Sequence, residues 1–245
     1  DQKRDEFIAA LLAIMGDPRL LWLPKGADTT TSTDDSRYAA TITWDATVAA
    51  RKSTLGSGLA QDFDGTDDEG DIPDADRYSF GDGVVDQAFS VVVLCKPDVT
   101  NQTMTLVSKS NSATVQEYEL LLDSIGRFEV QLLDASATAT ISSRHGNTIG
   151  TDSTLLGFTY DGSRAFSGMN LYKDAVILSV TETLVGTYTA MENTASLVNI
   201  GARYTTKARF FDGNIALVAV CAKCLTIENI WSIKALCNAY FDLAL

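Results

Sequence analysis

The chain has 245 residues, 21% of them charged and 45% hydrophobic, and a formal net charge of −13. This acidic balance argues against nucleic acid or an anionic membrane as a partner, because phosphate groups are bound by clustered Lys and Arg. No apolar run approaches the roughly 20 residues of a membrane-spanning helix. The length is typical of one large all-β sandwich, which buries about 70–75% of its unfolded surface and needs no covalent cross-links.

The four cysteines are too few for a disulfide framework. Cys221 and Cys224 form one C-x-x-C pair, but a zinc site takes four ligands, and only Cys95, Cys237 and His145 remain to complete it. We therefore expect reduced thiols, buried like small hydrophobic side chains.

The first segment, residues 1–16, is predicted to form an amphipathic helix that ends at Gly16, just before Asp17 and Pro18. Its apolar stripe at helical spacing consists of Phe7, Ile8, Leu11, Leu12 and Met15. Two placements are compatible with this stripe. The helix either packs on its own domain or serves as an attachment arm that docks on another subunit.

Residues 25–61 are rich in Thr, Ser, Asp and Gly and are predicted to form a long surface excursion, of the kind that often carries binding sites. Trp44 in this excursion is either a platform on which a sugar ring stacks or a packed core residue. Trp44 and Tyr204 are the candidate ligand-binding residues.

Later segments carry the signature of short strands. In residues 127–134, Phe128, Val130 and Leu132 alternate with polar side chains, as in a half-buried strand. Asp-Gly pairs fall between apolar runs, where tight turns need a positive φ. Residues 215–222 carry no charge, which predicts a strand buried on both faces, and a helix is expected to open at Thr226.

An ordered series of short motifs resembles the laminin G-like (LamG) jelly-roll domains, relatives of the concanavalin A-type lectins, over about residues 20–238. The series consists of residues 63–68 (FDGTDD), 72–73 (IP), 89–98 (FSVVVLCKPD), 106–109 (LVSK), 118–120 (YEL), 126–128 (GRF), 159–163 (TYDGS), 171–174 (LYKD), 200–203 (IGAR) and 210–213 (FFDG). The chain departs from the family at Ala175, where the family usually has Gly, and at residues 155–158, where it usually has Trp-His.

The resemblance implies an all-β, two-sheet antiparallel jelly-roll sandwich over residues 17–245, with an N-terminal helix and a short C-terminal helix. It also implies that the two FDG turns converge at one edge of the sandwich. Asp64, Asp67, Asp68 and Asp212 are therefore candidate ligands for Ca²⁺, which binds loop carboxylates and carbonyls. The alternative is a solvated acidic loop that binds no ion.

The concanavalin-like architecture also includes glucanases, so we considered the carboxylates as catalytic groups. Glu117 and Glu119 would share one strand face, with Asp123 farther along. They do not reproduce the Glu-x-Asp-x-Glu signature of those glucanases, and His145 lies in what is predicted to be a polar loop. No nucleophile with a partnered base is recognisable, so no enzymatic activity is expected.

Two functional classes remain. The leading hypothesis is a non-catalytic structural or decoration protein of a bacteriophage virion surface, with capsid or other virion proteins as partners and with glycan or host-surface binding. In this hypothesis the residue 1–16 stripe docks on the partner, because the LamG-like part closes its own core without it. The alternative is an extracellular lectin-like adhesion module that binds carbohydrate or protein.

Overall fold

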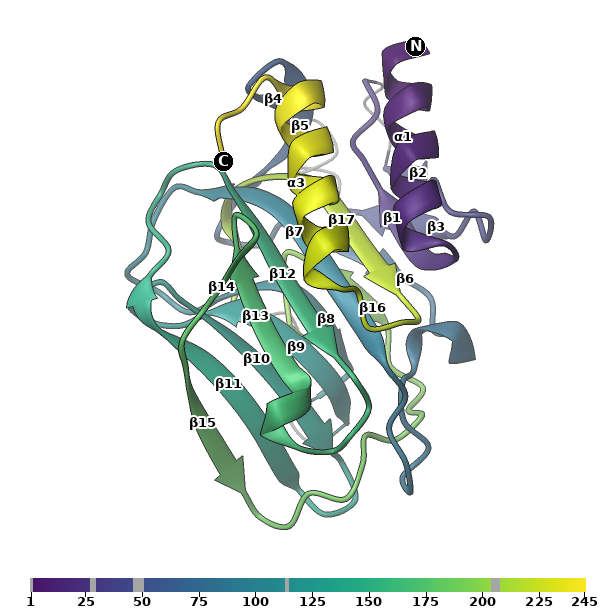
Figure 1. Ribbon diagram of the computed structural model, residues 1–245, viewed down its shortest axis with the longest axis vertical. Coiled ribbons are helices and arrows are strands. Elements are labelled where there is room, and N and C mark those ends of the chain that lie inside the picture. Colours follow the sequence, from purple (N-terminus) through teal and green to yellow (C-terminus); the bar gives the residue numbers. More distant parts are fainter. Residues whose placement is uncertain (1, 27–29, 46–50, 113–114, 204–207) are drawn as a thin grey trace.

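The computed structural model describes residues 2–26, 30–45, 51–112, 115–203 and 208–245. Two antiparallel sheets pack face to face, and helices α1 (Gln2–Met15) and α3 (Ile227–Phe241) lie side by side on the outer face of one sheet (Figure 1). This architecture confirms the predicted fold class. Neither helix in the described part of the chain is long and apolar enough to cross a membrane.

The sheet beneath the helices, called sheet A, has eight strands. In spatial order they are β14 (Val176–Ile177), β13 (Met169–Lys173), β12 (Thr154–Tyr160), β7 (Phe89–Pro97), β17 (Asp212–Cys221), β5 (Gly58–Asp64) and β4 (Lys52–Leu55), with β1 (Pro18–Trp22) also paired to β17.

The opposite sheet, called sheet B, has nine strands. In spatial order they are β15 (Val180–Val185), β11 (Ala139–Thr148), β10 (Arg127–Asp134), β9 (Gln116–Leu122), β8 (Met104–Ser110), β16 (Val198–Ile200), β6 (Gly70–Ile72), β3 (Thr41–Trp44) and β2 (Thr31–Thr33). Two short 3₁₀ helices, η1 (Asp76–Tyr78) and η2 (Phe166–Gly168), lie in the connections.

Strand β17 is buried on both faces, as its uncharged sequence predicts. Val218 and Val220 point into the core between the sheets, whereas Leu217 and Ala219 face the helices. All four side chains are fully buried. The strand pairs with β7, β5 and β1 at once, and it therefore joins the two hydrophobic clusters of the molecule.

Helix α1 packs on its own domain. Phe7, Leu11 and Met15 are buried in the cluster beneath α3, and Ile8 and Leu12 are half-buried against the same cluster. The Phe7 ring stacks on Tyr240 of α3 with centroids 4.3 Å apart. Of the two placements left open by the sequence, the structure shows the intramolecular one, so this stripe is not exposed for docking on a neighbouring subunit. The physical reason is that β17 leaves an apolar outer sheet face that both helices cover.

Helix α3 opens where the sequence predicts. The Thr226 side chain accepts a hydrogen bond from the backbone N–H of Asn229, and the Asn229 side chain bonds back to the Thr226 N–H. This reciprocal pair satisfies two N–H groups that a helix start leaves without partners. Glu228 lies in the first turn, where its charge suits the positive end of the helix.

The departure from the family at Ala175 has a structural counterpart. Asp174 and Ala175 form the tight turn between β13 and β14, with φ values of 51° and 62°. Positive φ at both central positions is the geometry for which hairpins favour Gly. The Asp174 carboxylate helps to hold the turn, because it accepts hydrogen bonds from the Leu155 N–H and the Thr154 hydroxyl.

We expect Leu11→Ala to lower the free energy of unfolding by about 2–4 kcal/mol, because it opens a cavity between α1 and the cluster beneath α3. Leu12→Ala, at a half-buried position of the same helix, should have a smaller effect. Urea denaturation followed by circular dichroism measures both changes. An unchanged unfolding midpoint in Leu11→Ala, with an altered mass by light scattering, would instead favour the attachment-arm hypothesis.

Candidate functional site

The two FDG turns lie side by side at the ends of two neighbouring strands of sheet A, β5 and β17. Asp212, the first residue of β17, is in register with Asp64, the last residue of β5. The Gly65 N–H donates to the Phe211 carbonyl oxygen at 3.0 Å. Gly65 has a φ of 74°, and a Cβ there would lie 2.9 Å from the Asp212 Cβ. The close approach of the two turns therefore requires glycine at this position.

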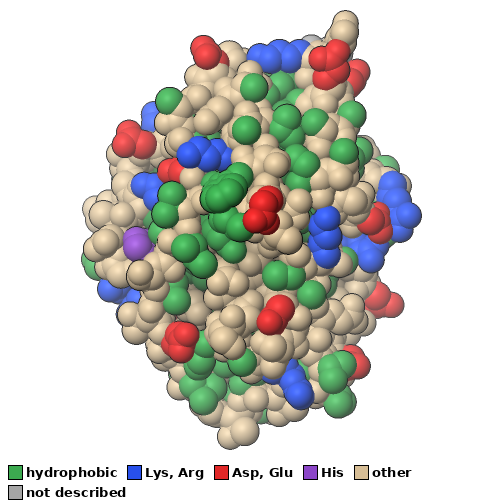
Figure 2. All heavy atoms as spheres, viewed as in Figure 1, with side chains coloured by type: hydrophobic (Ala, Val, Ile, Leu, Met, Phe, Trp, Pro, Cys, Tyr) green, Lys and Arg blue, Asp and Glu red, His purple; other side chains and the backbone are tan. Residues whose placement is uncertain are grey.

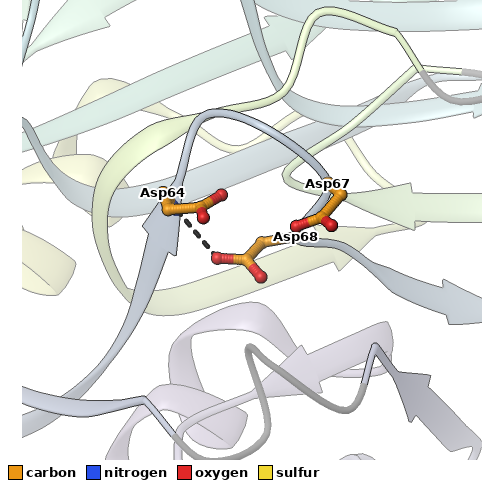
Figure 3. Close-up of side chains that lie close together, drawn as sticks. All are labelled: Asp64, Asp67 and Asp68. Atoms are coloured by element: carbon orange, nitrogen blue, oxygen red, sulfur yellow. Dashed lines mark hydrogen bonds between the residues drawn. The ribbon is translucent and has the colours of Figure 1, made fainter.

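Three carboxylates gather in the first of these turns. Asp64, Asp67 and Asp68 each offer an oxygen within 4.8 Å of the others, and the Asp64 N–H donates to Asp68 Oδ2 at 2.8 Å (Figure 3). Arg51 holds the cluster from outside. One of its guanidinium nitrogens lies 2.7 Å from Asp64 Oδ2, and the other lies 2.7 Å from Asp68 Oδ2.

Arg51 competes with a metal ion for this cluster. Calcium takes six to eight oxygen ligands, and here the guanidinium of Arg51 already occupies oxygens of Asp64 and Asp68. Asp212 does not belong to the group of oxygens that could share one ion within the described residues. Arg51 supplies one positive charge to three carboxylates, so the turn keeps a net negative charge.

Asp64 and Asp212 experience opposite electrostatic environments. Burial raises the pKa of Asp64, but hydrogen bonds from Thr66 and Arg51 outweigh it and hold the value below its usual range. Burial also raises the pKa of Asp212, and the nearby charges of Asp98 and Asp64 raise it further. Asp212 therefore carries a charge that its surroundings disfavour, whereas Asp64 carries one that they stabilise.

Trp44 is packed, and one edge of it borders a pocket. Its ring lies 4.8 Å from that of Trp22, and its indole Nε1 donates to Ser32 Oγ at 2.7 Å. A Cβ on Gly70 would lie 2.4 Å from the Trp44 ring, so the partner strand needs glycine here. Tyr204, the other candidate ligand residue, lies outside the described residues.

The space beside Trp44, called the Trp44 pocket, has a volume of about 210 Å³. Its walls include Trp22, Lys25, Thr33, Trp44, Lys52 and Gln61. The Lys52 ammonium donates to Gln61 Oε1 at 3.0 Å, and the Lys25 ammonium donates to the Thr33 carbonyl oxygen at 2.7 Å. The pocket thus combines two aromatic side chains with two cations, an amide and hydroxyl groups.

Lys52 and Gln61 were not predicted to be site residues, and residues 25–61 were expected to form a surface excursion. The structure places four short strands there, β2 to β5. The β4–β5 hairpin turns at Gly56, where a Cβ would lie 1.9 Å from the Phe241 carbonyl oxygen. The signal for this hairpin was the Gly56-Ser57-Gly58 sequence between two strand-length segments.

The carboxylates of β9 are closed off from solvent. Glu119 accepts a hydrogen bond from the Thr105 hydroxyl at 2.5 Å and forms an ion pair with Arg209 at 3.2 Å. Glu117 lies 2.9 Å from the Lys109 ammonium. The pKa of Glu117 is raised overall, because the effect of burial exceeds the opposite effect of Lys109. Because both glutamates have 0% exposed surface, neither presents its carboxyl group to a substrate.

The histidine and the cysteines, which were also considered for catalysis or metal binding, make contacts within the fold. His145 lies on strand β11, not in a loop as the sequence suggested, and its Nδ1 lies 3.0 Å from the Ser179 carbonyl oxygen. Burial raises the pKa of Cys221 and of Cys237 to about 12, so both are protonated thiols at neutral pH. All four cysteines are free.

A family model of the concanavalin A-like lectin/glucanases superfamily matches residues 64–230. Among curated proteins, none matches this sequence. Solved structures with the same fold include the botulinum neurotoxin serotype D ligand binding domain in complex with N-acetylneuraminic acid, with a TM-score of 0.63, 14% identity and coverage of 92% of this chain and 52% of that chain.

Two further structures share the fold. The binding domain of paraclostridial mosquitocidal protein 1 has a TM-score of 0.70 and 9% identity, over 94% of this chain and 53% of that chain. The botulinum neurotoxin type G receptor binding domain has a TM-score of 0.62 and 12% identity, over 90% of this chain and 51% of that chain. The chain thus spans about half the length of these domains, and at such identities the likeness concerns the fold alone.

We expect Asp64→Asn and Asp212→Asn to change stability in opposite directions. The pKa of Asp64 is lowered on folding, so its charge stabilises the fold above the unfolded value of about 4, and this contribution is lost as the pH falls toward the folded value. The pKa of Asp212 is raised, so its charge destabilises the fold at neutral pH. At pH 7, Asp64→Asn should lower the melting temperature and Asp212→Asn should raise it.

The pH dependence gives the control. The gain in Asp212→Asn should vanish below about pH 4, where the carboxyl group is protonated in both folded and unfolded chains. Thermal melts with calcium and with chelator complete the measurement. A loss of stability in Asp212→Asn that occurs only in calcium would contradict the account, because only a bound ion would need that carboxylate.

Proposed function

This chain belongs to the concanavalin A-like lectin/glucanases superfamily, and from that premise we propose that it is a non-catalytic domain that binds carbohydrate. The observation that carries the proposal is the Trp44 pocket. Small-molecule sites in proteins are concave and present a few fixed polar groups that orient the ligand. The Trp44 pocket offers a concave surface and such polar groups, and it is bordered by one edge of the Trp44 ring, which is 6% exposed.

Charge indicates the class of sugar. Two ammonium groups, those of Lys25 and Lys52, border the pocket, although the chain as a whole has a net charge of −13. Lys25 also lies 3.3 Å from Asp35 Oδ1, and Lys52 donates to Gln61 Oε1 at 3.0 Å, so both ammonium groups are held in place by protein contacts at the pocket. We propose that the pocket takes one acidic sugar residue, whose carboxylate pairs with Lys52. Its volume of about 210 Å³ suits a single ring.

The toxin domain in complex with N-acetylneuraminic acid supports the choice of an acidic sugar as a probe. This chain covers about half of that domain, so the proposal rests on the pocket of this chain and not on the position of the sugar in the toxin. The sialic acid is therefore tested on this protein directly.

The non-catalytic part of the proposal is supported by the burial of Glu117 and Glu119. A retaining glycosidase needs two carboxyl groups that reach the scissile bond, and both of these side chains are enclosed by Lys109, Thr105 and Arg209. Hydrolysis of a polysaccharide that is abolished by Glu119→Gln would contradict it.

A second candidate function is a structural role in a larger assembly, with a bacteriophage virion surface as the setting. The observation that favours an assembly is strand β15, which is at the edge of sheet B and exposes Leu184 by 56% and Val185 by 55%. Exposed apolar edge strands pair readily with other chains. Light scattering tests this candidate, because an assembly protein should associate through β15 and Leu184→Lys should abolish the association.

We expect N-acetylneuraminic acid to bind the wild-type chain and Lys52→Ala to weaken the affinity by about tenfold or more, because a charged hydrogen bond contributes about 1.5–3 kcal/mol. Isothermal titration calorimetry measures the change. Lys234→Ala on α3 removes the same charge away from the pocket and should leave the affinity unchanged. An equal loss of affinity in Lys52→Ala and Lys234→Ala would show that only the net charge of the protein matters. An equal affinity of the wild-type chain for a neutral hexose would contradict an acidic-sugar site.

A further inference from the structure

A second and larger cavity lies near the edge of sheet A that is opposite the Trp44 pocket. It is located between the start of α3 and the β13–β14 hairpin. Its volume is about 660 Å³, within the range of roughly 300–1,000 Å³ typical of small-molecule sites. Figure 2 shows hydrophobic side chains gathered near the middle of the face that carries α3 and this hairpin. This cavity does not share a lining residue with the Trp44 pocket.

The walls of this cavity, called the α3 cavity, are mainly apolar. Tyr172 and Leu225 form its buried part, and Val176, Ile177 and Trp231 form its exposed rim. The rim side chains are exposed by 64%, 58% and 56%, respectively. Trp231 has a fixed position, because its indole Nε1 donates to the Ala175 carbonyl oxygen at 2.9 Å. The Trp231 part of the rim is therefore held in a defined position. A ligand that covered the rim would be stabilised by removing apolar surface from water.

A hydroxyl group without a hydrogen-bond partner lies in the wall of this cavity. Thr159 of β12 is 1% exposed, and its Oγ1 has no hydrogen-bond partner of ordinary geometry in the described part of the chain. Its sulfur neighbour Cys224 is only a weak acceptor. A buried hydroxyl left without a partner is unfavourable by about 1–3 kcal/mol, so the group is suited to a ligand that supplies the missing bond.

The cavity disfavours a charged ligand, because burying a charge without a paired group of opposite charge is unfavourable. No charged side chain lines it among the described residues. The start of α3 borders the cavity, but Thr226 and Asn229 already cap it, and Glu228 places a negative charge in the first turn. An anionic ligand would meet this charge and a net charge of −13 without a cationic partner.

We propose that the α3 cavity binds an uncharged amphipathic small molecule, with its apolar body against Tyr172, Ile177 and Trp231 and one hydrogen-bonding head on Thr159. This site is separate from the Trp44 pocket and does not depend on the proposed carbohydrate binding.

The test uses three eight-carbon ligands that differ in the head group and its charge: 1-octanol, octanoate and octylammonium. Binding is followed by nuclear magnetic resonance through the indole N–H signals of the three Trp residues, with the Trp231 signal assigned from Trp231→Phe. We expect 1-octanol to shift the Trp231 signal saturably and to leave the other two in place. Octanoate should bind at least tenfold more weakly.

Two threonine variants separate a ligand-binding role from a structural one. Thr159→Val removes the unpartnered hydroxyl with little change of shape, so it should leave the melting temperature unchanged or higher while weakening octanol binding about three- to tenfold. Thr105→Val on β8 is the control. Its buried hydroxyl donates to Glu119 Oε1 at 2.5 Å, and it does not line the cavity, so its loss should lower the melting temperature and leave octanol affinity unchanged.

Several results would overturn the proposal. One is the absence of a saturable shift of Trp231 with 1-octanol. Another is an affinity for octanoate or octylammonium equal to that for 1-octanol, since the head would then not be selected. Thr159→Val behaving like Thr105→Val would assign the hydroxyl to the fold. A dimer by light scattering that Trp231→Ala dissociates would assign the cavity to a second copy of the chain.

Discussion

The structure depends on the burial of strand β17 on both of its faces. A strand with apolar side chains on alternating sides must be covered twice, and here the two covers are of different kinds. Sheet B covers the face of Val218 and Val220, and the helices cover the face of Leu217 and Ala219. Helices α1 and α3 come from opposite ends of the chain, and their contact closes the fold over β17 (Figure 1).

The same strand sets the positions of both candidate sites. At its start β17 pairs with β5, which contributes Asp64 to the acidic turn and Gln61 to the Trp44 pocket. On the other side of β17, β7 and β12 carry sheet A out to the β13–β14 hairpin, where the α3 cavity lies. The two sites are therefore held at a fixed separation by a continuous hydrogen-bonded sheet.

The sandwich, β17 and the start of α3 were predicted from the sequence because each depends on a local pattern. The sandwich follows from alternating strands separated by Asp-Gly turns, β17 from its uncharged run, and the start of α3 from the capping residue Thr226. The acidic turn was identified from the sequence, but its ion pair with Arg51 was not. Arg51 is 13 residues from Asp64, and the β4–β5 hairpin brings the two side chains together. The stripe of Phe7 and Leu11 indicated burial without indicating the partner surface. The role inferred for Thr159 depends on a missing contact, which no sequence pattern records.

The claim that this fold presents a carbohydrate site at the Trp44 pocket is tested most directly by mapping backbone amide shifts while N-acetylneuraminic acid is titrated into the labelled chain. The account predicts saturable shifts confined to β2, β3, β4 and β5, together with the Trp44 indole N–H. Shifts confined to the outer face of sheet B or to the acidic turn, or no saturable shift at all, would contradict it.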